Sequence, residues 1–78
     1  MSKKVIVYTQ PSCPPCKIVK QFLDHHNVEY IEKDISVDNN ARNTLINELS
    51  STSTPTITVD EHVITGFDLQ RLENLLGI

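Results

Sequence analysis

Residues 5–16 read VIVYTQPSCPPC, and this stretch decides the fold. Its apolar beginning, Val5–Tyr8, predicts a strand over Lys3–Tyr8 that is covered on both faces. Its end holds both cysteines of the chain, Cys13 and Cys16. The pair therefore follows the first strand directly and stands where the next element begins.

A helix is expected after the strand, beginning at Pro14 or Cys16 and ending at His26. Proline suits the start, because the first helical N–H has no partner to lose. Apolar residues recur every three or four positions, which is typical of a helix with one buried stripe. The predicted stripe is Cys16, Val19, Phe22, Leu23 and His26. Asn27 is expected to stop the helix in a left-handed conformation.

The rest of the chain continues with the same alternation of strand and helix. The expected elements are a strand Glu29–Ile35 near a sheet edge, a helix Asp38–Leu49, a loop over residues 50–54, and strands Thr56–Val59 and His62–Thr65. The last two strands form a hairpin that ends at Gly66. Asp68 then caps a final helix. Its apolar stripe is Leu69, Leu72, Leu75 and Leu76.

The order β-α-β-α-β-β-α predicts an α/β fold in a single domain over residues 1–78. A strand–helix–strand unit in one sheet is nearly always a right-handed crossover, so the first two strands should be parallel. The hairpin adds an antiparallel pair. The expected architecture is a four-stranded mixed sheet with helices on both faces.

Composition narrows the classes of function. The chain has 78 residues, of which 38% are hydrophobic and 22% charged, with a net charge of −3. This mildly acidic balance argues against nucleic acid as a partner. No stretch approaches the roughly 18 apolar residues of a membrane helix. The apolar run after Lys3 and Lys4 is too short for an export signal, so we expect a cytoplasmic protein without a membrane partner.

The spacing of the two cysteines predicts redox chemistry. Residues three apart lie on one side of a helix, which brings the sulfurs of Cys13 and Cys16 into disulfide range. So small a loop stabilises the fold weakly, so the bridge is free to open and close. Cys13 lies at the helix N-terminus, where a thiolate is favoured. We therefore expect Cys13 to be the attacking nucleophile and the less exposed Cys16 to be the resolving thiol.

The two prolines between the cysteines predict a reducing pair. Neither Pro14 nor Pro15 has an N–H, so a thiolate at Cys13 can draw on the amide of Cys16 alone. A less stabilised thiolate favours a reductase over an oxidant. Replacing Pro15 with Tyr or His should lower the pKa of Cys13. Lys17 could offset part of the loss of thiolate stabilisation that the prolines cause, by placing positive charge nearby.

Two other uses of the cysteines are weaker. A zinc site would need ligands from His25, His26 and His62, but adjacent histidines point about 100° apart on a helix. We expect His26 to be partly buried at the helix end and the other two to lie on the surface. No metal is expected. A static structural disulfide suits an exported protein better than this one.

The chain resembles the glutaredoxin family of the thioredoxin fold over essentially its whole length. The resemblance rests on three segments: Val7-Tyr8-Thr9 before Cys13-Pro14-Pro15-Cys16, Thr54-Pro55 before a strand, and Gly66-Phe67-Asp68 before the last helix. It implies that Pro55 is a cis proline facing the cysteines. The backbone of Thr54 would then offer an N–H and a C=O to an extended substrate.

The resemblance also implies a substrate-binding surface around the cysteines. Its members would be Ser12, Pro14, Pro15, Thr54, Pro55, Gly66, Phe67 and Asp68. The family's glutathione-using members usually carry an aromatic residue at the position of Pro15 and a Gly-Gly-x-Asp-Asp segment, both absent here. Asp68 could therefore be a helix cap or a ligand to glutathione. The single glycine followed by phenylalanine, Gly66-Phe67, resembles the corresponding segment of redoxins linked to ribonucleotide reductase. Those redoxins take electrons from thioredoxin reductase.

These observations favour a dithiol–disulfide oxidoreductase that reduces protein or small-molecule disulfides. Its electron donor would be glutathione or a reductase, and no tightly bound cofactor is expected. The alternatives are a glutathione-dependent glutaredoxin and an iron–sulfur cluster carrier, whose cluster would use the first cysteine and glutathione. A binding module without redox chemistry would leave the two cysteines unexplained. We expect a monomer.

Overall fold

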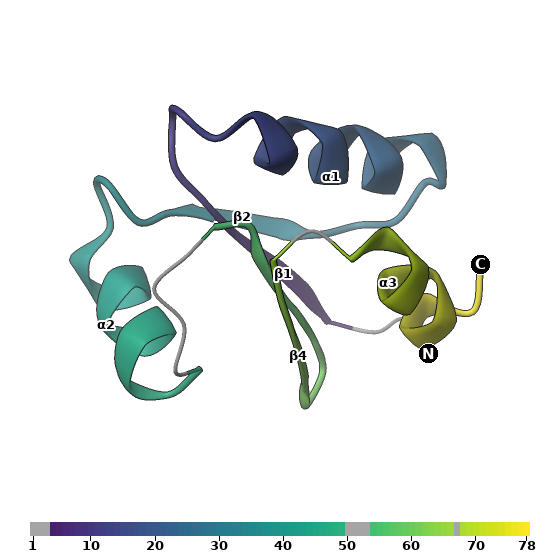
Figure 1. The fold of residues 1–78 in the computed structure, drawn as a ribbon. Coiled ribbons are helices and arrows are strands. Elements are labelled where there is room, and N and C mark those ends of the chain that lie inside the picture. The colour runs from purple at the N-terminus through teal and green to yellow at the C-terminus, as the bar shows by residue number, and fades with distance from the viewer. Residues whose placement is uncertain (1–3, 50–53, 67) are drawn as a thin grey trace.

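The computed structural model describes residues 4–49, 54–66 and 68–78. Its elements follow in the order β-α-β-α-β-β-α, as the sequence predicts. They are β1 (Val5–Thr9), α1 (Pro14–His25), β2 (Ile31–Asp34), α2 (Asn39–Asn47), β3 (Thr56–Val59), β4 (His62–Thr65) and α3 (Leu69–Leu76) (Figure 1). Within the described part of the chain, no helix is both long and apolar enough to cross a membrane.

One mixed sheet joins the four strands in the order β2-β1-β3-β4. The central strand β1 is parallel to β2 and antiparallel to β3, and β4 is antiparallel to β3. At the end of β1, Thr9 is the register partner of Asp34 and Tyr8 that of Thr56. Thr65 in turn pairs with Thr56. The last residues of β1, β2 and β4 therefore lie level with the first residue of β3. The connections to α1, α2 and β3 and the turn after β4 thus meet at one end of the sheet.

Helices cover both faces of the sheet, with α1 and α3 on one and α2 on the other (Figure 1). The alternation of side chains along β1 explains this division. Val5 and Val7 join the buried cluster that contains Leu23 of α1 and Leu72 of α3. Tyr8 joins Ala41 and Leu45 of α2 on the opposite face. A strand that is apolar on both faces is thus buried from both sides, which confirms the expectation for β1.

The main differences from the predicted boundaries lie at element ends. β2 is shorter than Glu29–Ile35, because the residues before Ile31 carry the chain back from the end of α1, where the Val28 amide donates to the Leu23 carbonyl. α2 is also shorter than predicted. Asp38 caps it through a bond from the Ala41 amide at 3.0 Å.

The predicted environment of His26 is wrong. His26 is exposed, like His25 and His62. α1 ends one residue earlier, at His25, and Asn27 has the expected left-handed conformation with φ +57°. The His26 ring packs on the outside of the helix against Phe22, with ring centroids 4.6 Å apart. The buried part of the stripe is Cys16, Val19 and Leu23.

Replacing Leu23 with alanine should destabilise the fold strongly. Leu23 is fully buried, so Leu23→Ala loses apolar contact and leaves a cavity, at a cost of about 2–5 kcal/mol. Ile18→Ala is the matched control, because Ile18 lies on the same helix but is 47% exposed, and we expect a loss under about 1 kcal/mol. Urea unfolding of both oxidised variants measures the difference. Equal losses would show that α1 does not anchor the core through this face.

Candidate functional site

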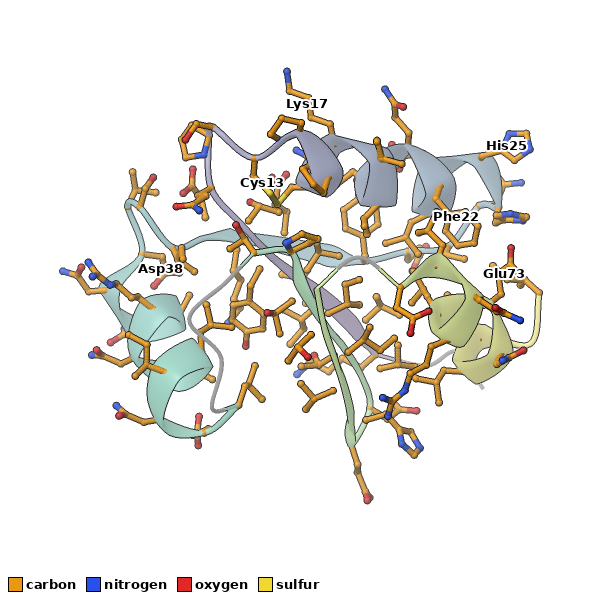
Figure 2. The ribbon with its side chains drawn as sticks, in the orientation of Figure 1. Cys13, Lys17, Phe22, His25, Asp38 and Glu73 are labelled. Carbon is orange, nitrogen blue, oxygen red and sulfur yellow. A yellow bond between two sulfur atoms is a disulfide. The ribbon has the colours of Figure 1, made fainter. Side chains whose placement is uncertain are left out.

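A disulfide joins Cys13 and Cys16 at the start of α1 (Figure 2). Cys13 is the N-cap residue and has extended backbone dihedrals, while Cys16 lies in the first turn. Their Cα atoms are 5.3 Å apart, within the range that a disulfide requires. Cys13 is 7% exposed and Cys16 2% exposed, so both residues are buried and Cys13 is the more exposed of the two.

Hydrogen-bond donors are scarce at the start of α1. Pro14 and Pro15 hold the first two helical positions and carry no N–H. The amide of Cys16 donates to the carbonyl oxygen of Cys13 at 3.1 Å, and the Cys13 side chain accepts no capping bond. The Cys16 amide, which the sequence analysis identified as the one donor for a Cys13 thiolate, is thus already bonded to a backbone carbonyl. This arrangement strengthens the expectation of a poorly stabilised thiolate.

Pro55 lies at the same end of the sheet as the disulfide. The Thr54–Pro55 peptide bond is cis, as the resemblance implied. Pro55 is buried and precedes Thr56, the register partner of Tyr8. Its carbonyl oxygen accepts a bond from the Gly66 amide at 3.1 Å. This bond fastens the loop before β3 to the turn after β4.

Thr54 is a partly exposed residue with a buried hydroxyl. The residue is half-buried, whereas its Oγ1 atom is inaccessible and has no hydrogen-bond partner among the described residues. An unpaired buried hydroxyl costs free energy. The packing of the fold around Thr54, and no hydrogen bond of its own, therefore keeps this hydroxyl buried.

The turn after β4 was predicted to bind substrate through Gly66, Phe67 and Asp68. Gly66 has φ +78°, a backbone conformation in which other residues are strained. Asp68 is the N-cap of α3, and its Oδ1 atom accepts from the Arg71 amide at 3.0 Å. The sequence left Asp68 open between cap and ligand, and the structure shows the cap. Phe67 lies outside the described residues.

The remaining predicted surface surrounds the first turn of α1. Ser12 and Pro14 are exposed and Pro15 is half-buried. Lys17 is exposed on the outer side of the helix (Figure 2). Among the residues that the structure describes, no group of three or more His, Cys, Asp and Glu side chains is placed to hold a metal ion.

A polar network that joins the end of β1 to β2 and α1 was missed by the sequence reasoning. The Thr9 hydroxyl donates to Oε2 of Glu32 at 3.0 Å, and the Lys20 ammonium donates to the same oxygen at 2.9 Å. The bond from Lys20 is the main cause that lowers the pKa of Glu32, and the same bond raises the pKa of Lys20. Spacing alone places Lys20 one turn after Cys16 on α1. The link to Thr9 becomes visible only with the pairing of β1 and β2.

Comparisons with known proteins agree with this architecture. A family model described as Glutaredoxin matches residues 5–64. A glutaredoxin-like 8.6 kDa protein in a rubredoxin operon of Clostridium pasteurianum is 26% identical over 70 residues, which cover 90% of this chain and 93% of the relative.

Two solved structures show how similar the fold is. The thioredoxin-like protein BC3987 is 52% identical, with a TM-score of 0.91, and the match covers 94% of this chain and 100% of that one. The glutaredoxin from Methanosarcina mazei Go1 is 27% identical, with a TM-score of 0.83, and the match covers 96% of this chain and 79% of that one. The fold is therefore thioredoxin-like.

Restoring an amide at position 15 should stabilise the Cys13 thiolate. Pro15→Ala supplies an N–H at the second helical position, from which N-cap side chains commonly accept. A hydrogen bond to a charged group contributes about 1.5–3 kcal/mol, so we expect the pKa of Cys13 to fall by about one unit or more. Thiol alkylation of the reduced protein across pH measures this change.

Pro14→Ala is the matched control for that measurement. The first helical position is not one from which an N-cap side chain usually accepts, so the change in the Cys13 pKa should be smaller. A Cys13 pKa that rises in Pro15→Ala, or an equal fall in both variants, would contradict the role given to Pro15.

Proposed function

The chain belongs to the glutaredoxin family, and on that premise we propose that it is a dithiol–disulfide oxidoreductase that reduces protein or small-molecule disulfides. The observation that carries the proposal is the Cys13–Cys16 disulfide at the N-terminus of α1. A bridge over so few residues constrains the unfolded chain little, so its main use is exchange.

The proposed cycle has two exchange steps. The Cys13 thiolate attacks one sulfur of a substrate disulfide, forms a mixed disulfide and releases the other substrate sulfur as a thiolate that takes a proton from water. Cys16 then loses its proton and attacks the Cys13 sulfur, which releases the second substrate thiol. Two electrons have passed to the substrate, and the Cys13–Cys16 disulfide remains to be reduced.

Position supports the roles given to the two sulfurs. Cys13 is the more exposed of the pair and stands at the positive end of the α1 macrodipole, where a thiolate is favoured. Cys16 is nearly inaccessible and lies one turn inside the helix. It can reach the Cys13 sulfur but not an external substrate, as a resolving thiol requires.

The substrate is proposed to lie along the loop before β3. The half-buried Thr54 precedes the cis Pro55, and its backbone would pair with an extended segment of the substrate, as a strand edge does. The exposed Ser12 and Pro14 would border the same segment. We propose that the substrate touches the turn after β4 only through its surface. The Gly66 amide and one Asp68 oxygen already have hydrogen-bond partners within the fold.

The reductant is proposed to be glutathione or a thioredoxin-reductase-type enzyme, with no tightly bound cofactor. A pair that has to be reduced again after each cycle suits a reducing compartment, which supports a cytoplasmic location. One Cys13–Cys16 pair completes the cycle within a single chain, so we propose a monomer.

Serine variants of the two cysteines should separate their roles. Cys13→Ser should abolish reduction of a protein disulfide such as that of insulin. Cys16→Ser should keep the first step and accumulate a mixed disulfide, visible as a mass increase equal to the attached substrate. If Cys13→Ser reduces disulfides as fast as the unaltered protein, the proposed function is wrong.

The electron donor is found by two coupled assays of NADPH oxidation. One contains glutathione and glutathione reductase, and the other contains thioredoxin reductase, each with the same disulfide substrate. We expect turnover in one of the two, and Cys13→Ser should remove it. Turnover that persists in Cys13→Ser would show that the signal does not come from this site.

A further inference from the structure

The helix α1 carries two lysines on the turns that follow the disulfide, and they differ in their partners. Lys17 is exposed, follows Cys16 directly and lies four residues after Cys13, a spacing that places two side chains on one side of a helix (Figure 2). Lys20 donates to Oε2 of Glu32 at 2.9 Å. Lys17 has no hydrogen bond or ion pair with any residue that the structure describes. The charge of Lys20 is thus offset within the fold, whereas that of Lys17 faces solvent close to the disulfide.

A groove of about 270 Å³ lies beside these turns, between α1 and the chain that leads into β2. It is lined by Lys17, Lys20, Gln21, Asp24, Tyr30 and Glu32. Glu32 is paired with Lys20. Burial, and then the charge of Asp24 and a hydrogen bond to it, raise the pKa of Tyr30, so Asp24 has a partner as well. Lys17 lines the end of the groove nearest to the disulfide, and its ammonium is the charge left there for a ligand.

Three carboxylates lie at the same end of the sheet but on other elements. Asp34, Asp38 and Asp68 each accept a hydrogen bond from a backbone amide. Asp38 and Asp68 cap α2 and α3, where the helix dipole offsets a negative charge. None of the three lines the groove. A substituent that enters the groove beside Cys13 therefore meets the Lys17 ammonium rather than these carboxylates.

We propose that Lys17 is a specificity residue whose ammonium attracts a carboxylate close to the reacting sulfur, so that the protein reduces acidic disulfides faster than basic ones. This inference rests on the proposed function and leaves its chemistry unchanged. The Cys13 thiolate bonds to one substrate sulfur, the substrate S–S bond breaks, and the displaced thiolate takes a proton from water. Cys16 then displaces the second thiol, so that two electrons have passed to the substrate. Opposite unit charges about 8 Å apart near a protein surface attract strongly enough to change a rate about 2- to 5-fold.

Three small disulfides of different charge test this preference. Dithiodipropionate carries two carboxylates, 2-hydroxyethyl disulfide carries no charge, and cystamine carries two ammonium groups. The reduced protein is mixed with each, the reaction is quenched with a thiol-alkylating reagent, and the oxidised fraction is measured by mass spectrometry. The ratio of the acidic to the basic rate is compared between variants, because a change in the pKa of Cys13 affects both rates alike and cancels. Lys17→Gln should lower this ratio about 4-fold or more, and Lys17→Glu should lower it further.

Lys4→Gln is the matched control, because it removes the same charge from an exposed lysine at the opposite end of β1. Five steps of strand separate Lys4 from Thr9, roughly 16 Å, which exceeds the Debye length of about 10 Å at 0.1 M salt. The ratio should therefore stay unchanged in Lys4→Gln at this salt concentration. An unchanged ratio in both Lys17 variants, or an equal fall in Lys4→Gln, would overturn the proposal, since Lys17 would then act through net charge alone or not at all.

Two disulfide-bonded peptides that differ only in an Asp or a Lys beside one cysteine extend the test to polypeptides. A preference for the Asp peptide that depends on Lys17 assigns the carboxylate to protein substrates, and a preference confined to the small disulfides assigns it to a small molecule. The uncharged disulfide separates this inference from the proposed function. If Cys13→Ser reduces it as fast as the unaltered protein does, both are wrong. If Cys13→Ser fails to reduce it and the rate ratios do not depend on Lys17, the inference alone is wrong.

Discussion

The pairing of β1 with a strand on each side is the constraint on which the site depends. Among the described strands, β1 alone is hydrogen-bonded to both a parallel and an antiparallel neighbour. Its register brings the end of β2 and the start of β3 to the end of the sheet where α1 begins. Because side chains alternate, a slip of one residue would exchange Thr9 and Tyr8 between the two faces of the sheet. The disulfide, the cis Pro55 and the Thr9–Glu32 bond would then no longer share one end of the molecule.

The first turn of α1 shows how backbone hydrogen bonding limits the chemistry. A helix N-terminus normally offers several free N–H groups to an anion. Here Pro14 and Pro15 supply none, and the Cys16 amide is bound to the Cys13 carbonyl. The helix dipole remains as an attraction for negative charge at Cys13. The start of α1 thus combines the helix dipole with few direct hydrogen-bond donors, and this combination is the basis for proposing that the pair acts as a reductant.

The sequence predicted the features that arise from local patterns. Apolar runs and helical spacing gave the element order and the shared face of Cys16, Val19 and Leu23, because these repeats depend on the backbone alone. His26 fits the same spacing, but α1 ends at His25 and the His26 side chain is exposed. The bond between Thr9 and Glu32 joins residues 23 positions apart and follows from sheet register, to which no local pattern points. Likewise, spacing could not choose between cap and ligand for Asp68.

The edge strand β2 shows how one residue serves two physical needs. Among the described strands, β2 is paired with β1 alone, and Ile31 on it is 49% exposed, so the strand risks pairing with another chain. Charged side chains on an edge strand oppose such pairing, and Glu32, Lys33 and Asp34 supply them. Since Val7 is the register partner of Glu32, this carboxylate also lies on the face that carries Thr9. A residue that protects the edge is therefore placed, by the same register, where its carboxylate accepts a hydrogen bond from the buried Thr9.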